Sequence, residues 1–177
     1  MKKLFLTGES GCGKSTAIAH ALGEQAVRCG GFFTRRYRQP YLYFTLESPD
    51  GSRKETFLDF SDGTPKLYLQ VFSRVTLEGN ILVLDEIGGM ELLDKAFRDR
   101  LYEALDRDVP MIGVLKGPGP AGALIEALGL GEAYIRQREA LEKRISQMTD
   151  TVLYPCGRFD ERARLLAEQW VKENLHG

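Results

Sequence analysis

The chain has 177 residues, of which 43% are hydrophobic and 28% are charged, and its formal net charge is -1. This balance is typical of a soluble globular protein, and a charge so close to zero gives no electrostatic reason to expect a nucleic-acid partner. The length suits one sizeable α/β domain, and no repeat or Pro/Gly/Ser-rich linker divides it, so we expect a single domain over residues 1–177.

The cysteines and the first residues indicate a cellular compartment. Cys12, Cys29 and Cys156 form an odd, scattered set without a C-x-x-C pair, which argues against a disulfide framework and fits a reducing cytosol. The start MKKLFLTGES is basic but lacks the apolar run of a signal peptide, and no stretch approaches the length of a membrane span. We therefore expect a cytoplasmic protein without membrane association. The sequence leaves its oligomeric state open.

The first half of the chain is dominated by expected strands. An apolar run that ends at a glycine loop indicates a buried strand, and the spacing of Ile18, Ala21 and Leu22 indicates a helix after it. We expect strands at residues 2–7, 30–37, 41–47 and 54–60 and a helix at residues 14–25. The SPDG tetrapeptide at 48–51 suits a type I turn, so the last two strands should form an antiparallel hairpin. Residues 65–79 are compatible with a helix or a strand.

The second half alternates between strands and helices. We expect strands at residues 80–86 and 110–115 and helices at residues 90–105, 120–128, 138–148 and 160–175. Apolar residues at helical spacing support three of these helices: Leu93, Ala96, Phe97, Leu101, Ala104 and Leu105; Leu141, Ile145 and Met148; and Ala163, Leu166, Ala167, Trp170 and Val171. The alternation predicts an α/β fold in which a mostly parallel sheet is flanked by helices and the hairpin is an antiparallel insertion.

One stretch carries a complete binding motif. Residues 8–15, GESGCGKS, satisfy the phosphate-loop (P-loop) pattern G-x-x-x-x-G-K-[ST], and the strand before them and the helix after them supply the context that the motif needs. The glycines let backbone N–H groups point inward, and the helix start adds its positive dipole end. The predicted nucleotide-binding residues are Gly8, Glu9, Ser10, Gly11, Cys12, Gly13, Lys14, Ser15 and Thr16.

Three side chains of this loop have separate expected roles. Lys14 should reach the β- and γ-phosphates and so take part in catalysis. The Ser15 hydroxyl should bind Mg²⁺. Cys12 is either a small filler or a reactive thiol activated by the adjacent helix N-terminus, and the sequence does not decide between these.

Two carboxylates follow the most apolar strand of the chain, at residues 80–86. Asp85 and Glu86 lie at its C-terminal end, where α/β sheets bind their ligands. Asp85 can hold Mg²⁺ opposite Ser15, and Glu86 can orient or deprotonate an attacking water, as the catalytic base of a hydrolase does. The alternative is that the pair only caps the exit of the strand.

Several other charged residues have two interpretations. In the first interpretation, one arginine neutralises charge on the transferred phosphoryl group, as an arginine finger does. In the second, all of the arginines lie on solvated faces. The candidates are Arg35, Arg36, Arg38, Arg136, Arg138 and Arg144. Lys116, after the strand at 110–115, is a further candidate contact for the γ-phosphate. Glu91 either stabilises the start of the helix that follows Gly88 and Gly89 or pairs with an arginine of the site.

The strings TGESGCGKST, GGFFTRR and LVLDEIGGMELLDKAFRDRL occur in that order. Together they resemble the small nucleoside triphosphatases called cancer-related NTPases, at residues 8–16, 31–34, 85–91 and Phe97, and the D-E-I-G-x-M-E string is the most distinctive part. The family's further R-x-G-F element is replaced here by RRYRQPYLYF, and the last third of the chain carries no matching motif. The resemblance implies a P-loop NTPase fold and Mg²⁺-dependent hydrolysis of ATP, GTP and other nucleoside triphosphates with loose base preference.

The motifs therefore predict an enzyme that is a nucleoside-triphosphate phosphatase. Lys14 and Glu86 are its predicted catalytic residues, Ser15 and Asp85 its predicted metal ligands, Mg²⁺ its cofactor, and a nucleoside triphosphate its partner. Two alternatives remain open: a small-molecule or nucleotide kinase of the same fold, and a nucleotide-binding adapter with slow hydrolysis. Whether phosphate release needs an acceptor distinguishes the kinase, and the rate of hydrolysis distinguishes the adapter.

Overall fold

The computed structural model describes residues 1–117, 119, 122, 126, 128–158 and 160–175. Its framework is one sheet with the strand order β5-β4-β3-β2-β6-β7-β1-β8. The strands are β1 (Lys3–Thr7), β2 (Gly30–Tyr37), β3 (Tyr43–Glu47), β4 (Lys54–Asp59), β5 (Lys66–Leu67), β6 (Leu82–Ile87), β7 (Met111–Leu115) and β8 (Thr151–Pro155). The pairs from β2 to β8 across β6, β7 and β1 are parallel, whereas β2–β3, β3–β4 and β4–β5 are antiparallel.

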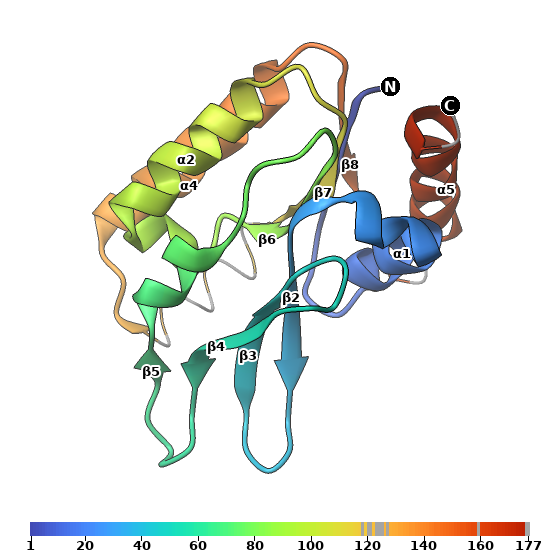
Figure 1. Ribbon diagram of the computed structural model, residues 1–177. Coiled ribbons are helices and arrows are strands. Elements are labelled where there is room, and N and C mark those ends of the chain that lie inside the picture. The colour runs from blue at the N-terminus through green and yellow to red at the C-terminus, as the bar shows by residue number, and fades with distance from the viewer. Residues whose placement is uncertain (118, 120–121, 123–125, 127, 159, 176–177) are drawn as a thin grey trace.

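The α-helices whose bounds the described residues define cover the two faces of the parallel part of the sheet. They are α1 (Lys14–Leu22), α2 (Lys95–Asp106), α4 (Glu132–Gln147) and α5 (Glu161–Leu175), and short 3₁₀ turns occur at η1 (Gly23–Arg28), η2 (Leu69–Arg74) and η3 (Met90–Leu93). Figure 1 shows α1 and α5 on one side of the sheet and α2 and α4 on the other. None of the helices in the described part of the chain is long and apolar enough to cross a bilayer.

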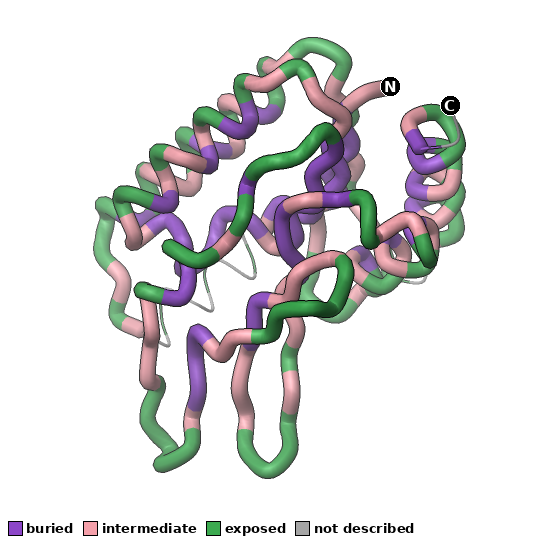
Figure 2. The backbone as a smooth tube through the Cα atoms, viewed as in Figure 1, coloured by how far each residue is buried: buried purple, intermediate pink, exposed green. Residues whose placement is uncertain are grey.

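The core has two layers because successive strand residues point to opposite faces. In β1, Leu4 and Leu6 belong to the cluster under α1 and α5, whereas Phe5 belongs to the cluster under α2 and α4. Strands β1, β6 and β7 are buried on both faces, which is why their sequences are continuous apolar runs. Figure 2 shows this buried centre and the exposed tips of the antiparallel strands.

The predicted fold class is confirmed: an α/β sheet, mostly parallel, with an antiparallel hairpin attached. The strand at Gly30–Tyr37 has the predicted bounds, and Gly51 N donates to Ser48 O (2.9 Å) in the predicted turn of the hairpin. The ambiguous segment 65–79 contains both a short strand, β5, and the 3₁₀ turn η2. The predicted helix at 120–128 lies largely outside the described residues.

Two sequence-based predictions need correction, and one strand was missed. The helix expected at 90–105 is broken, because Asp94 takes an extended conformation and accepts a hydrogen bond from Phe97 N, so that α2 begins at Lys95 and Ala96 is exposed. The helix expected at 138–148 begins six residues earlier, at Glu132. Strand β8 was not predicted, because this edge strand is only partly buried and ends at Pro155.

Replacing Trp170 with alanine should destabilise the fold strongly. The indole is fully buried between α5 and the sheet, and its Nε1 donates to Lys2 O (2.9 Å), which also accepts from Met111 N (3.0 Å). The change therefore leaves a cavity and removes one of the two hydrogen bonds to this carbonyl. We expect the free energy of unfolding in urea to fall by about 3–5 kcal/mol. The matched control is Leu165→Ala on the same helix, where the side chain is 51% exposed and the expected change is within about 0.5 kcal/mol. Equal effects of the two changes would contradict this packing.

Candidate active site

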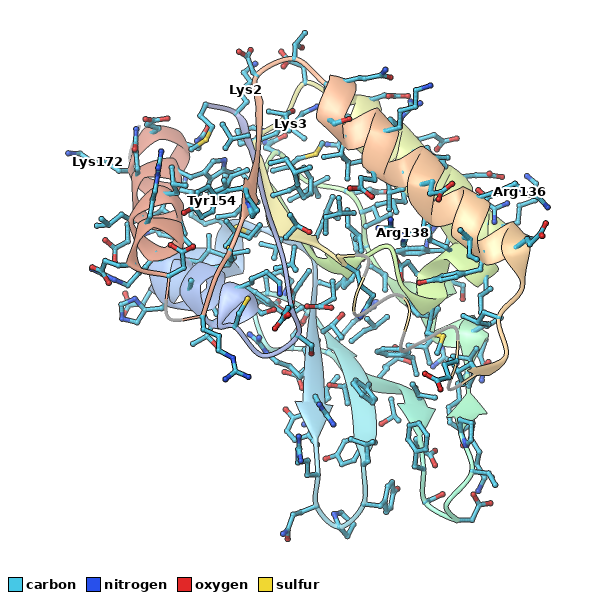
Figure 3. The ribbon with its side chains drawn as sticks, turned by 180° about the vertical axis from the view of Figure 1, so that it is seen from behind. Lys2, Lys3, Arg136, Arg138, Tyr154 and Lys172 are labelled. Carbon is cyan, nitrogen blue, oxygen red and sulfur yellow. The ribbon has the colours of Figure 1, made fainter. Side chains whose placement is uncertain are left out.

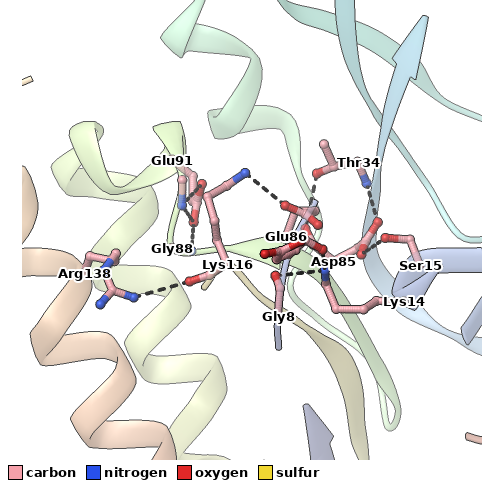
Figure 4. Close-up of polar contacts among 12 residues, drawn as sticks. Gly8, Lys14, Ser15, Thr34, Asp85, Glu86, Gly88, Glu91, Lys116 and Arg138 are labelled. Atoms are coloured by element: carbon pink, nitrogen blue, oxygen red, sulfur yellow. Dashed lines mark hydrogen bonds and ion pairs between the residues drawn. The ribbon is translucent and has the colours of Figure 1, made fainter. Parts of the chain in front are cut away.

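The candidate site lies where three neighbouring parallel strands end. The P-loop follows β1, Asp85 and Glu86 lie at the end of β6, and Lys116 follows β7, which lies between β1 and β6. The carboxyl ends of parallel strands share one edge of the sheet, so segments far apart in sequence meet there. Figure 4 shows these residues together with Thr34 from β2 and Arg138 from α4.

The P-loop has the backbone that the motif predicts. Gly8, Gly11 and Gly13 all have positive φ angles, of 129°, 78° and 99°. At Gly8 a side chain is also excluded by space, because an added Cβ would lie 2.5 Å from the carbonyl oxygen of Cys156. Helix α1 begins at Lys14, so its free N–H groups face the loop, which is the arrangement that binds phosphate.

The ammonium of Lys14 is folded back into the loop. The side chain is buried, and its Nζ donates to Gly8 O (3.1 Å), to Glu9 O (2.6 Å) and to the Cys12 thiol (3.4 Å). These acceptors carry no formal charge, so negatively charged phosphate oxygens can replace them. The contact also shows Cys12 packed against the lysine, but it does not decide whether the thiol is a filler or reactive.

Ser15, Thr34 and Asp85 form a hydrogen-bonded group at the expected metal position. Ser15 Oγ donates to Asp85 Oδ1 (2.7 Å), Thr34 N donates to Asp85 Oδ2 (3.0 Å), and Thr34 Oγ1 donates to the backbone oxygen of Asp85 (3.2 Å). The contact of Ser15 with Asp85 brings together the two residues that the sequence predicted as metal ligands. Thr34 was part of the GGFFTRR string, but sequence reasoning gave it no role, because its contact depends on the pairing of β2 with β6.

In the part of the chain that the structure describes, the Asp85 carboxylate accepts hydrogen bonds from Ser15 and Thr34 but forms no ion pair. Asp85 is 0% exposed, and burial together with the nearby charge of Glu86 raises its pKa to about 7, against the opposing hydrogen bonds from Ser15 and Thr34. A divalent cation beside it would offset that cost. Hydroxyl and carboxylate oxygens are hard ligands that suit Mg²⁺, which keeps several waters and so needs few protein ligands. The described residues accordingly hold no group of three His, Cys, Asp or Glu side chains that would cage a metal.

Glu86 is placed by an irregularity in the sheet. The register between β6 and β7 shifts between Leu84 and Ile87, and Glu86 itself has a φ of 58°, which is uncommon for a residue other than glycine. Its carboxylate leaves the regular alternation of the strand and pairs with Lys116, with Oε2 lying 2.9 Å from Nζ. Such strain is found where the surrounding structure fixes a functional side chain.

Glu91 holds the loop that follows β6. Its buried carboxylate accepts hydrogen bonds from Gly88 N (2.5 Å) and Gly89 N (3.0 and 3.1 Å), so its partners are backbone groups and not an arginine. Burial raises the pKa of Glu91 in spite of these bonds. Tyr134, which no sequence signal singled out, donates from its hydroxyl to Gly88 O (2.8 Å) and ties the same loop to α4.

The candidate arginines separate into two groups. Arg136 pairs with Glu132 and Arg144 with Asp106, both at the surface, which supports the interpretation of a solvated face. Arg138 differs: it pairs with Glu142 (2.9 Å) and also donates to Lys116 O (3.3 Å) at the site. Figure 3 shows Arg136 projecting away from the body of the molecule, whereas Arg138 lies toward the sheet.

Two of the early candidate arginines, Arg35 and Arg36, lie on β2. Arg35 lies over the Phe33 ring (4.4 Å from the guanidinium carbon to the centroid), and its charge only partly opposes the rise in the pKa of Asp85 that burial causes. Arg36 lies over the Phe44 ring at 5.8 Å, on the antiparallel part of the sheet. Arg35 is therefore the early arginine whose charge acts on Asp85.

Known proteins with similar sequences are nucleoside-triphosphatases. The chain is 31% identical over 129 residues to the nucleoside-triphosphatase THEP1 of Thermotoga petrophila, which spans 64% of this chain and 72% of that protein. It is 26% identical over 131 residues to THEP1 of Methanocaldococcus jannaschii, which spans 64% of this chain and 77% of that protein.

Two solved structures share the fold. The crystal structure of THEP1 from Aquifex aeolicus superposes with a TM-score of 0.65 at 21% identity, over 96% of each chain. The solution structure of a human cancer-related nucleoside triphosphatase gives a TM-score of 0.64 at 21% identity, over 97% of this chain and 96% of the other.

A family-level match agrees with these relatives and with the resemblance found in the sequence. The model of the NTPase family matches residues 47–145, which include both site carboxylates at the end of β6, the end of β7 and most of α4. Because this match covers more than half of the chain, the protein belongs to the NTPase family.

Proposed function

We propose that this protein hydrolyses nucleoside triphosphates to the diphosphate and inorganic phosphate, with Mg²⁺ as cofactor. The observation that carries the proposal is the position of Glu86, a carboxylate fixed by a sheet irregularity next to the predicted metal ligand Asp85 and on the same sheet edge as the P-loop. Membership of the NTPase family and the names of the relatives support hydrolysis as the reaction.

The residues of the site have separate proposed roles in the reaction. The loop N–H groups and Lys14 bind the triphosphate, and Ser15 and Asp85 hold Mg²⁺, which when bound neutralises phosphate charge. Glu86 orients a water molecule and accepts one of its protons. The water oxygen bonds to the γ-phosphorus while the bond from that phosphorus to the β–γ bridging oxygen breaks, so that the diphosphate leaves with the bridging oxygen.

The finer assignments have separate support. The resemblance to the cancer-related NTPases implies a loose base preference, and on that basis we propose that ATP, GTP and other nucleoside triphosphates are all substrates. Both halves of the site lie on one sheet, which supports a single nucleotide-binding domain over residues 1–177. All three cysteines are free, which fits a protein of the reducing cytoplasm.

A phosphate-release panel tests the proposal. The purified chain is incubated with ATP, GTP, CTP and UTP in turn, with Mg²⁺ or with EDTA, and without any acceptor. We expect release of phosphate from several of the four with Mg²⁺ and loss of release with EDTA. Turnover that appears only after a small-molecule or nucleotide acceptor is added would instead establish the kinase. Nucleotide binding by the folded chain without turnover would establish the adapter.

A further inference from the structure

Lys116 occupies the central position of the site. It follows β7, and β7 lies between the strand that leads to the P-loop and the strand that leads to Glu86. The next residue, Gly117, touches the loop: a Cβ added there would lie 3.3 Å from Gly8 O. A cationic group is therefore presented between the phosphate cradle and the proposed catalytic base.

The backbone of Lys116 is fixed on both sides. Its N–H donates to Ile87 O (2.8 Å), and its carbonyl accepts from Arg138 (3.3 Å). Only the four-carbon stem is then free to move, and it crosses the loop after β6 so closely that a Cβ on Gly89 would lie 3.1 Å from Cε of Lys116. A fixed base with a flexible stem allows the ammonium to change partners without a change in the fold.

The ion pair between the Lys116 ammonium and Glu86 would hinder the proposed role of Glu86 in catalysis. Lys116 Nζ lies 2.9 Å from Glu86 Oε2, with the two side chains 19% and 21% exposed. A carboxylate oxygen that already accepts a hydrogen bond from an ammonium is less available to accept one from a water molecule. Glu86 can act on water only if this ion pair is weakened when the substrate is in place.

We infer that Lys116 is a γ-phosphate ligand that exchanges its ion pair with Glu86 for the γ-phosphate, and that it thereby distinguishes triphosphates from diphosphates. The inference rests on the proposed hydrolysis. A γ-phosphate carries more negative charge than one carboxylate and offers oxygens that accept charge-assisted hydrogen bonds. A diphosphate offers no group at this position, so with the product bound the Lys116–Glu86 pair stays closed.

Calorimetry on Lys116→Met tests this inference, with ADP and the β,γ-imido analogue of ATP as ligands in the presence of Mg²⁺. The parent should bind the analogue more tightly than ADP. In the variant we expect affinity for the analogue to fall about tenfold or more and affinity for ADP to stay within about threefold, because a hydrogen bond from a charged group is lost only with the γ-phosphate. Lys172→Met, an exposed lysine on α5 (Figure 3), is the matched control and should keep the parent ratio.

A double variant separates contact from mere neutralisation. If Lys116 only shields the γ-phosphate from the charge of Glu86, its loss should have no effect once that charge is removed. If Lys116 binds the γ-phosphate, adding Lys116→Met to Glu86→Gln should lower the affinity for the analogue by a factor similar to that seen for Lys116→Met alone. Lys116→Gln serves in place of methionine if circular dichroism shows that the first variant is unfolded.

The outcomes are distinct from those of the proposed function. Phosphate release by the parent chain tests hydrolysis, whereas the ratio of analogue to ADP affinity tests Lys116. A parent-like ratio in Lys116→Met, or an effect that vanishes in the Glu86→Gln background, overturns the inference even if the parent hydrolyses every triphosphate.

Discussion

Lys14→Ala is expected to remove nucleotide binding and turnover together. Its ammonium is buried in the P-loop, where the present acceptors are the carbonyls of Gly8 and Glu9 and the Cys12 thiol. Phosphate oxygens would replace these neutral groups, and each charged hydrogen bond so gained contributes about 1.5–3 kcal/mol. We therefore expect the affinity for Mg²⁺–ATP, measured by calorimetry, to fall by about 100-fold or more.

Two further variants show whether the loss is specific. Lys143→Ala removes an exposed lysine from α4 and should leave both binding and phosphate release at the parent level. Lys14→Arg keeps the positive charge but presents a planar fork in place of a point charge, so it should also fail to restore turnover. Parent-like affinity and turnover in Lys14→Ala, with an unchanged unfolding midpoint, would show that this is not a phosphate-binding loop.

The sequence predicted the parts of the site that depend on local chemistry. The P-loop follows from glycines that need positive φ angles and from a lysine at the helix start, all within eight residues. Asp85 and Glu86 follow from the position of two carboxylates at the end of a buried strand. These signals are short-range, so one sequence suffices to recognise them.

The contacts between strands were beyond the reach of the same reasoning. Thr34 reaches Asp85 only because β2 pairs with β6 in one register, and Lys116 meets Glu86 only because the sheet register shifts between Leu84 and Ile87. A shift of one residue in the pairing of two strands moves every side chain to the opposite face of the sheet, and the local sequence pattern does not indicate such a shift. Tyr134 lies near the start of α4, before the apolar residues whose spacing predicted that helix, so the sequence pattern did not include it.

The limits of the elements were missed for related reasons. Asp94 ends one turn and caps the next helix, a role that is decided by its extended backbone and not by the apolar stripe around it. Strand β8 pairs with β1 along its whole length, but its residues are only partly buried, so their pattern is weak. Burial that comes from tertiary packing cannot be read from five residues.

Glu86→Gln is expected to abolish most of the turnover while nucleotide binding persists. The amide keeps the size and the hydrogen-bonding reach of the carboxylate, and glutamine can occupy the same backbone conformation, whose φ is 58°. It cannot accept the water proton, so kcat for phosphate release should fall about 100-fold or more, the scale of a lost general base. The affinity for the β,γ-imido analogue of ATP should not fall, because a negative charge has been removed from beside the γ-phosphate and Lys116 has been released from its ion pair.

Asp85→Asn is the matched comparison, because it makes the same chemical change one residue earlier. Asp85 is buried and contacts Ser15 and Thr34, so we expect its charge to act on the proposed metal position and not on the water. Its loss should raise the Mg²⁺ concentration needed for half-maximal phosphate release, whereas Glu86→Gln should leave that concentration unchanged and lower only the plateau. Parent-rate hydrolysis of ATP and GTP by Glu86→Gln would remove Glu86 from the mechanism. The strained backbone at this position would then serve the Lys116 ion pair alone, and the water would have to be oriented by another group of the site.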